Sequence, residues 1–170
     1  MPSTVRFRLD DDGVSALRDL RARLAGAGIP VSSGTPQVTV AAGGTIPRGA
    51  RDALAAELRL VALPALWLAG LGSVTGDDDA LVLTAVTDPE VLAVHTAVHD
   101  ALAGRVRGAH AAHLPGSWLP HVVLATGRPA AAFALLHPVK PVRARILAVE
   151  LHDSRTGETE TLTAPGRSDG

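Results

Sequence analysis

Two short segments of the sequence place side chains that exchange protons or form hydrogen bonds in corresponding positions. Residues 35–43 and 119–127 share a proline, a valine, an alanine and a closing glycine at one constant offset. His121, in the second segment, carries an imidazole, a group that can take up or release a proton. Gln37 stands at the same place in the first segment, followed by Thr39, and both can hydrogen-bond a ligand. The two segments together predict a small two-sided site for acid/base chemistry.

Each segment predicts a buried strand, because a proline opens it, an apolar run follows and a glycine begins a turn. Successive side chains of a strand point to opposite faces. One face is apolar and packs in the core: Val38, Val40, Val122 and Leu124. The other face points into a groove between two similar lobes, with the two strands side by side: Gln37, Thr39, His121 and Val123. For His121 alone, the alternative is a partly buried histidine with a satisfied hydrogen bond.

The composition is that of an ordinary globular domain. The chain has 170 residues, of which 46% are hydrophobic, and a formal net charge of −1, which predicts one domain over residues 1–164 and a disordered tail over 165–170. It has no cysteine, so disulfides, thiolate catalysis and cysteine-based zinc sites are excluded. Aromatic residues make up only 2%, which argues against extensive binding of single-stranded RNA by base stacking.

The ends and the apolar runs predict a cytoplasmic location. The N-terminal residues do not show the basic-then-apolar pattern of a signal peptide. The longest apolar stretch, residues 61–71, is too short to span a bilayer and contains Pro64. The preference for Ala, Gly, Arg and Val over Lys and Ile is typical of a GC-rich bacterial genome.

Periodicity along the chain predicts a mixed α+β order of elements. Alternating or short apolar runs predict strands at 5–9, in the two segments above, and at 65–73, 80–86, 142–151 and 160–163. Helical spacing, with caps or early prolines, predicts helices at 14–25, 46–58, 88–102 and 129–136. Asp88-Pro89-Glu90 is a strong helix start, because it combines a cap, a first-turn proline and an early acid.

Other acids and histidines leave both a metal site and a structural role open. The acids at 10–12 favour capping of the next helix over metal binding. His95 and His99 lie one helical turn apart, a spacing that suits either a metal or an ordinary pair on one helix face. The acids at 77–79 predict a solvated hairpin loop.

Two sets of basic residues could meet an anionic ligand. The loop at 104–116 either guides such a ligand to the groove or is a solvated connection. Arg143 and Arg145 share one face of a predicted strand, and they suit phosphate recognition if that face lines the groove. Otherwise they are an exposed pair. The basic side chains of the loop are Arg105, Arg107, His110 and His113.

The two segments resemble the motifs of the 2H phosphoesterase superfamily, which includes the 2′-5′ RNA ligase-like and RNA 2′,3′-cyclic phosphodiesterase proteins. That family carries two His-x-Thr/Ser motifs, often after a proline, and the matching stretches here are 36–40 and 118–125. The resemblance extends over residues 5–163. It implies a duplicated two-lobe fold in which two mainly antiparallel sheets face a central groove, with helices outside. It also implies metal-independent acid/base chemistry on the phosphodiester of an RNA end or small nucleotide, without a cofactor.

Each motif departs from the family pattern in a different half. Gln37 replaces the first histidine although Thr39 is present, and Val123 replaces the second hydroxyl residue although His121 is present. The candidate catalytic residues are His121, Gln37 and Thr39, and the candidate substrate-binding residues are Val123, Arg143, Arg145 and Trp118. Two hypotheses follow. One is a weak or altered 2H phosphoesterase with His121 as the acid/base. The other is a catalytically lapsed domain that binds a nucleotide, an RNA end or a protein partner.

Overall fold

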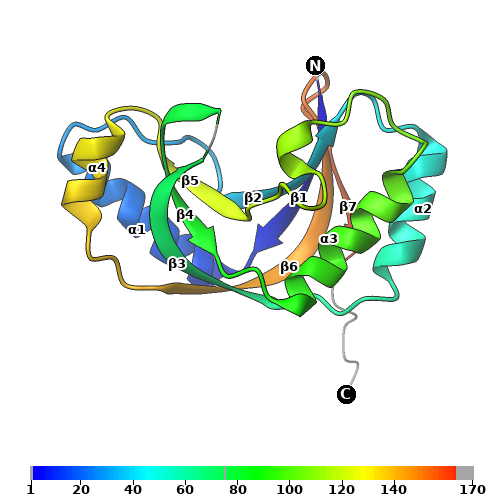
Figure 1. The fold of residues 1–170 in the computed structure, drawn as a ribbon, viewed down its shortest axis with the longest axis horizontal. Helices are drawn as coiled ribbons and strands as arrows, with labels where there is room; N and C mark the ends of the chain where they lie inside the picture. The colour runs from blue at the N-terminus through cyan, green and yellow to red at the C-terminus, as the bar shows by residue number, and fades with distance from the viewer. Residues whose placement is uncertain (1, 75, 164–170) are drawn as a thin grey trace.

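One long strand, β6, joins two halves of an α+β fold in the computed structural model (Figure 1). The structure describes residues 2–74 and 76–163, so the tail predicted at 165–170 lies outside the described residues. The elements are β1 (Ser3–Leu9), α1 (Asp11–Gly26), β2 (Gln37–Gly43), α2 (Arg48–Leu58), β3 (Ala65–Val74), β4 (Asp77–Ala85), α3 (Pro89–Leu102), the 3₁₀ turn η1 (Ala111–His113), β5 (His121–Ala125), α4 (Pro129–Leu136), β6 (Val142–Asp153) and β7 (Thr159–Thr163).

The sheet explains how the two repeated segments meet. Its strand order is β2-β1-β6-β3-β4-β5, with β7 also on β6, and the paired strands are antiparallel. The first part of β6 pairs with β3 and the rest pairs with β1. The sheet therefore folds on itself, and β2 and β5, at opposite ends of the strand order, contact each other at the centre of the molecule (Figure 1).

The predicted fold class is confirmed. One detail differs, because the two facing sheets are continuous through β6 within the described part of the chain. Helices α1 and α4 cover the outside of one half, and α2 and α3 cover the outside of the other (Figure 1). The core between them contains buried side chains from both repeated segments, including Val38, Val40, Val122 and Leu124. The predicted apolar faces of the two strands are therefore the buried ones.

Acidic caps fix the starts of two helices. The Asp10 side chain accepts a hydrogen bond from the Gly13 amide at 3.1 Å, so this acid caps α1, as predicted. The side chain of Asp88 accepts from the Val91 amide at 2.9 Å, and Pro89 follows it in the first turn of α3. The acids at 77–79, predicted in a loop, instead form the exposed start of β4, because the pairing of this strand with β3 extends to Asp77.

Replacement of Asp88 by alanine is expected to lower the free energy of unfolding by about 1 kcal/mol, because an amide at the start of α3 loses its acceptor. Urea denaturation of the wild type and the variant measures the change. Asp100→Ala, at an exposed position in the last turn of the same helix, is the matched control, because Asp100 makes no capping hydrogen bond within the described residues. Equal midpoints for the two variants would contradict the capping role.

None of the described helices is long and apolar enough to cross a bilayer.

Candidate functional site

A small polar pocket lies where β2 and β5 meet. Its volume is about 150 Å³, and residues from both repeated segments line it. Gln37 and Thr39 come from β2, and His121 and Val123 come from β5, as the alternation along the two strands predicted. Their chemical roles stay predictions. The full lining consists of Arg21, Ser32, Ser33, Thr35, Gln37, Thr39, His113, His121 and Val123.

The ring of His121 is held in one orientation by its own segment. Its Nδ1 lies 2.7 Å from the carbonyl oxygen of Leu119. Because a carbonyl oxygen can only accept, Nδ1 carries a hydrogen and donates it. The neutral ring therefore has its free lone pair on Nε2. Such a ring can accept a proton at Nε2 or, when protonated, donate one from the same atom.

Arg21 brings a positive charge to the pocket from helix α1. The residue is only 8% exposed. Its Nε and Nη2 donate to the carbonyl oxygen of Val123 at 3.2 and 2.8 Å, and its Nη1 donates to the carbonyl oxygen of Gly34 at 2.8 Å. Burial, and then the neighbouring Arg18, lower the pKa of Arg21, although a guanidinium stays charged in proteins.

No acid in the described part of the chain compensates the charge of Arg21. Within residues 2–74 and 76–163 no ion pair joins it to a carboxylate, and no Asp or Glu is among the residues that line the pocket. The remaining polar lining consists of hydroxyl, amide and imidazole groups that can donate hydrogen bonds. A pocket of this chemistry is suited to an anion.

His113, on the turn η1, is the second imidazole of the pocket. Burial lowers its pKa to about 4, and the nearby histidines add to the shift through like-charge repulsion, with His110 first and His121 next. His113 is therefore neutral at neutral pH. The sequence placed it only in a basic loop.

A second pocket adjoins the first. Its volume is about 510 Å³, and it shares His113 and His121 with the polar pocket. The rest of its lining is mostly apolar or small: Ser73, Val74, Ala111, Ala112, Ser117 and Leu119. The two histidines thus stand between a polar chamber and a largely apolar one.

Trp118 belongs to the core and does not line the polar pocket. It is 9% exposed, and its indole Nε1 donates to the carbonyl oxygen of Thr39 at 2.9 Å. The indole also stacks on the ring of His95, with centroids 4.1 Å apart and an interplanar angle of 8°. Trp118, named above as a candidate substrate-binding residue, is therefore not available to stack a base, because its indole is nearly buried, packs on His95 and donates its N–H to Thr39.

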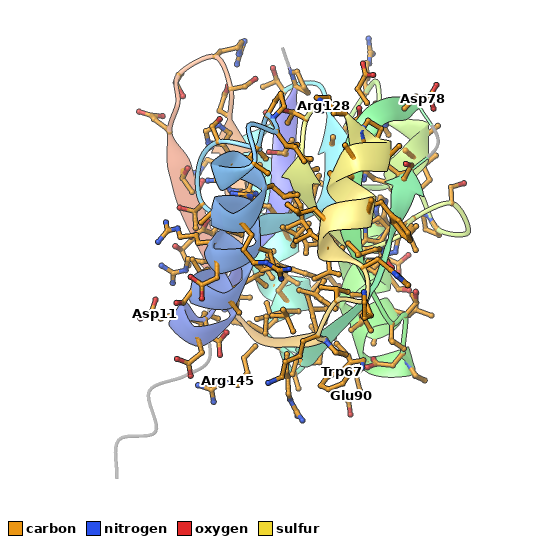
Figure 2. All side chains as sticks on the ribbon, turned by 90° about the vertical axis from the view of Figure 1, so that its left-hand side faces the viewer. Asp11, Trp67, Asp78, Glu90, Arg128 and Arg145 are labelled. Carbon is orange, nitrogen blue, oxygen red and sulfur yellow. The ribbon has the colours of Figure 1, made fainter. Side chains whose placement is uncertain are left out.

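Arg143 and Arg145 do not reach the pocket. They are exposed on β6, where the alternate residues Val142 and Ala144 point into the core. Arg145 Nε lies 3.6 Å from a carboxylate oxygen of Asp10. Figure 2 shows Arg145 pointing outward at the end of the molecule where Trp67 also lies. The two arginines are thus the exposed pair of the sequence-based alternative, and Arg21 holds the charge at the pocket instead.

The helix-face histidines bind backbone groups. The Nε2 of His95 lies 2.8 Å from the carbonyl oxygen of His113, and the Nε2 of His99 lies 3.2 Å from that of Val40. No group of three or more potential ligand side chains that could hold a metal ion is found among the described residues. The His95–His99 pair therefore anchors neighbouring segments to α3.

One feature of the sequence indicates that Arg21 is buried. The apolar stripe of α1 contains Leu17 and Leu24, and Arg21 occupies the same stripe between them. A charge in that place is buried with the helix, so it needs polar partners in the core. Ser32, Ser33 and Thr35 gave no comparable sign, because polar residues before a strand are ordinary in loops.

An antiparallel sheet folded around a pocket between two repeated strands is the fold of the 2H phosphoesterases, and the predicted resemblance is confirmed at the level of the fold. E. coli LigT in complex with 3′-AMP matches with a TM-score of 0.61 and 14% identity, over 96% of this chain and 94% of that one. LigT complexed with NADP+ matches at 0.55 and 16%, over 95% and 94%. Usb1 of Kluyveromyces marxianus matches at 0.55 and 10%, over 95% and 97%. No family model and no curated protein matches the sequence.

Proposed function

We propose that this chain is a 2H-type phosphoesterase of weak or altered activity. Its substrate would be a 2′,3′-cyclic phosphate or a 2′-5′ phosphodiester of an RNA end or small nucleotide. The observation that carries the proposal is the pocket between β2 and β5, which contains a buried guanidinium with no acidic partner among the described residues and is otherwise lined mostly by hydrogen-bonding groups. The fold supports it, since LigT of the same fold has been crystallised with 3′-AMP.

The residues that line the pocket have two different roles in this proposal, proton transfer and phosphate binding. His121 transfers a proton through Nε2, while Arg21, the Thr39 hydroxyl and the Gln37 amide hold phosphate oxygens. Val123 adds no side-chain donor, although its carbonyl keeps Arg21 in place. The groups that act on the phosphodiester in this proposal are all side chains of the protein. We also propose that the protein is cytoplasmic.

The second candidate is a phosphate-binding domain without turnover. Gln37 favours it, because an amide cannot exchange a proton in the physiological range, so the first motif has no acid or base. The two candidates share the anion site and differ only in whether the bound phosphodiester is cleaved.

Replacement of Arg21 by methionine is expected to weaken 3′-AMP binding by about 10- to 100-fold, because hydrogen bonds to a charged group contribute about 1.5–3 kcal/mol. Isothermal titration calorimetry without added metal measures the change. Arg18→Met is the matched control, since Arg18 is exposed on the same helix and does not line the pocket.

The variant must remain folded for this comparison, because Arg21 also satisfies two carbonyl groups. Circular dichroism and a thermal melt establish that. A folded Arg21→Met protein that binds 3′-AMP as tightly as Arg18→Met would overturn the anion site. Hydrolysis of 2′,3′-cyclic AMP by the wild type without added metal, and its loss when His121 is replaced, separates the first candidate from the second.

A further inference from the structure

The pocket contains a second imidazole although the first motif has none. His113 lines the polar pocket together with His121 and Gln37, and both histidines also line the adjoining pocket. We propose that His113 supplies the second imidazole of the acid/base pair, in place of the histidine that the first motif lacks. This inference rests on the proposed function and assigns a role to a residue outside both repeated segments.

The turn that carries His113 is anchored on two sides. The His110 amide donates to the carbonyl oxygen of Ala42 in β2 at 2.8 Å, and the Nε2 of His95 in α3 donates to the carbonyl oxygen of His113 at 2.8 Å. Because the ring of His95 also stacks on Trp118, which donates to Thr39, the same contacts link η1 to the wall of the pocket. A ring on such a turn is held in position, as a catalytic group must be.

The surroundings of His113 keep it able to accept a proton. Its pKa of about 4 makes the ring neutral at neutral pH. The charged or titratable groups that act on it or share its pocket come from four elements: His110 from the same turn region, His95 and His99 from α3, His121 from β5 and Arg21 from α1. A bound phosphate adds negative charge, which raises the pKa of His113 toward the range useful to a base.

The imidazoles of His113 and His121 together carry out both proton transfers that cleavage of a cyclic phosphate requires. His113 takes a proton from a water molecule as the water oxygen bonds to phosphorus. The bond from phosphorus to one ribose oxygen of the cyclic phosphate breaks, and protonated His121 gives that oxygen its Nε2 proton. The product is a phosphomonoester with a free hydroxyl, His113 is left protonated and His121 neutral, and exchange with solvent restores both.

The test replaces His113 by glutamine and uses His110→Gln as the matched control. His110 is an exposed histidine next to the same turn and lines neither pocket. With 2′,3′-cyclic AMP as substrate and no added metal, kcat of His113→Gln is expected to fall by about 10²-fold with a small change in KM. The acid limb of the kcat/KM profile, near pH 4 in the wild type, should disappear in this variant and persist in His110→Gln.

An unchanged kcat and pH profile in His113→Gln, with an active wild type, would overturn the inference and leave the proposed function standing. For a wild type without measurable turnover, side-chain NMR titration of the histidines with 3′-AMP decides instead. The inference expects the pKa of both His113 and His121 to rise on binding, and a response of His121 alone overturns it. Absence of 3′-AMP binding would overturn the proposed function itself, and the inference with it.

Discussion

Replacement of His121 by alanine is expected to lower kcat/KM for 2′,3′-cyclic AMP by about 10²–10⁴-fold, the usual contribution of a general acid or base. The carbonyl of Leu119 holds Nδ1 of this ring, so Nε2 is the atom that exchanges a proton in the pocket. Alanine removes that atom and leaves Arg21 and Thr39 in place. Initial rates without added metal, over a pH series, measure the loss.

The same variant should still bind 3′-AMP within a few-fold of the wild type, because the charge of Arg21 is untouched. His137→Ala is the matched control, since His137 is exposed at the end of α4 and does not line the pocket. Wild-type turnover in a folded His121→Ala protein would exclude this histidine from the chemistry.

The side chains of the two repeated segments could be assigned to the core or to the pocket from the sequence, because successive residues of a strand point to opposite faces. Pro36 and Pro120 begin the two apolar runs, and alternation then assigns every second residue to one face. The structure places β2 and β5 in contact, with Gln37 and His121 lining the same pocket. Local sequence patterns could not predict the order of the strands in the sheet, in which β6 joins the two halves. The strand order depends on pairing between segments that are distant in the sequence.

The positive charge at the pocket could not be assigned from the sequence for a related reason. Arg145 shares a strand face with Arg143, but which face meets the groove depends on what packs against β6. There the apolar residues Val142 and Ala144 turn inward, so the arginines face outward. Arg21 comes from a helix far from β5 in the sequence and binds the carbonyl of Val123. Only the tertiary packing of α1 brings this pair together.

The roles of the histidines in the loop and on α3 could not be decided from the sequence, because their hydrogen-bond partners lie in distant segments. His95 and His99 had the spacing of a metal pair, yet their rings hydrogen-bond carbonyl groups of η1 and β2. Trp118 lies beside His121 in the sequence and was therefore a candidate substrate-binding residue, but its large ring is buried in the core with its N–H satisfied. The loop before β5 has no periodicity that could assign a direction to His113.

Restoring both motifs, with Gln37→His and Val123→Thr together, is expected to raise kcat for 2′,3′-cyclic AMP by about 10²-fold or more, because each motif regains the group that it lacks. Gln37 already lines the pocket that contains His121, so an imidazole at that position would face the same phosphate. The Val123→Thr change adds a donor at nearly the volume of valine and keeps the backbone carbonyl that binds Arg21. Gln37→Asn in the Val123→Thr background is the matched control, because asparagine keeps an amide that does not titrate.

The repaired protein also distinguishes between the sources of the second imidazole. If His113 serves the natural chain, then His113→Gln should cost about 10²-fold in the wild type and much less in the repaired protein, where the imidazole introduced by Gln37→His takes over the proton. Equal losses in both backgrounds would show that the two positions do not share one role. A repaired protein that binds 3′-AMP but turns over no faster than the asparagine control would mean that β2 holds this position outside the reach of an attacking water, and the chemistry would then belong to η1 and β5.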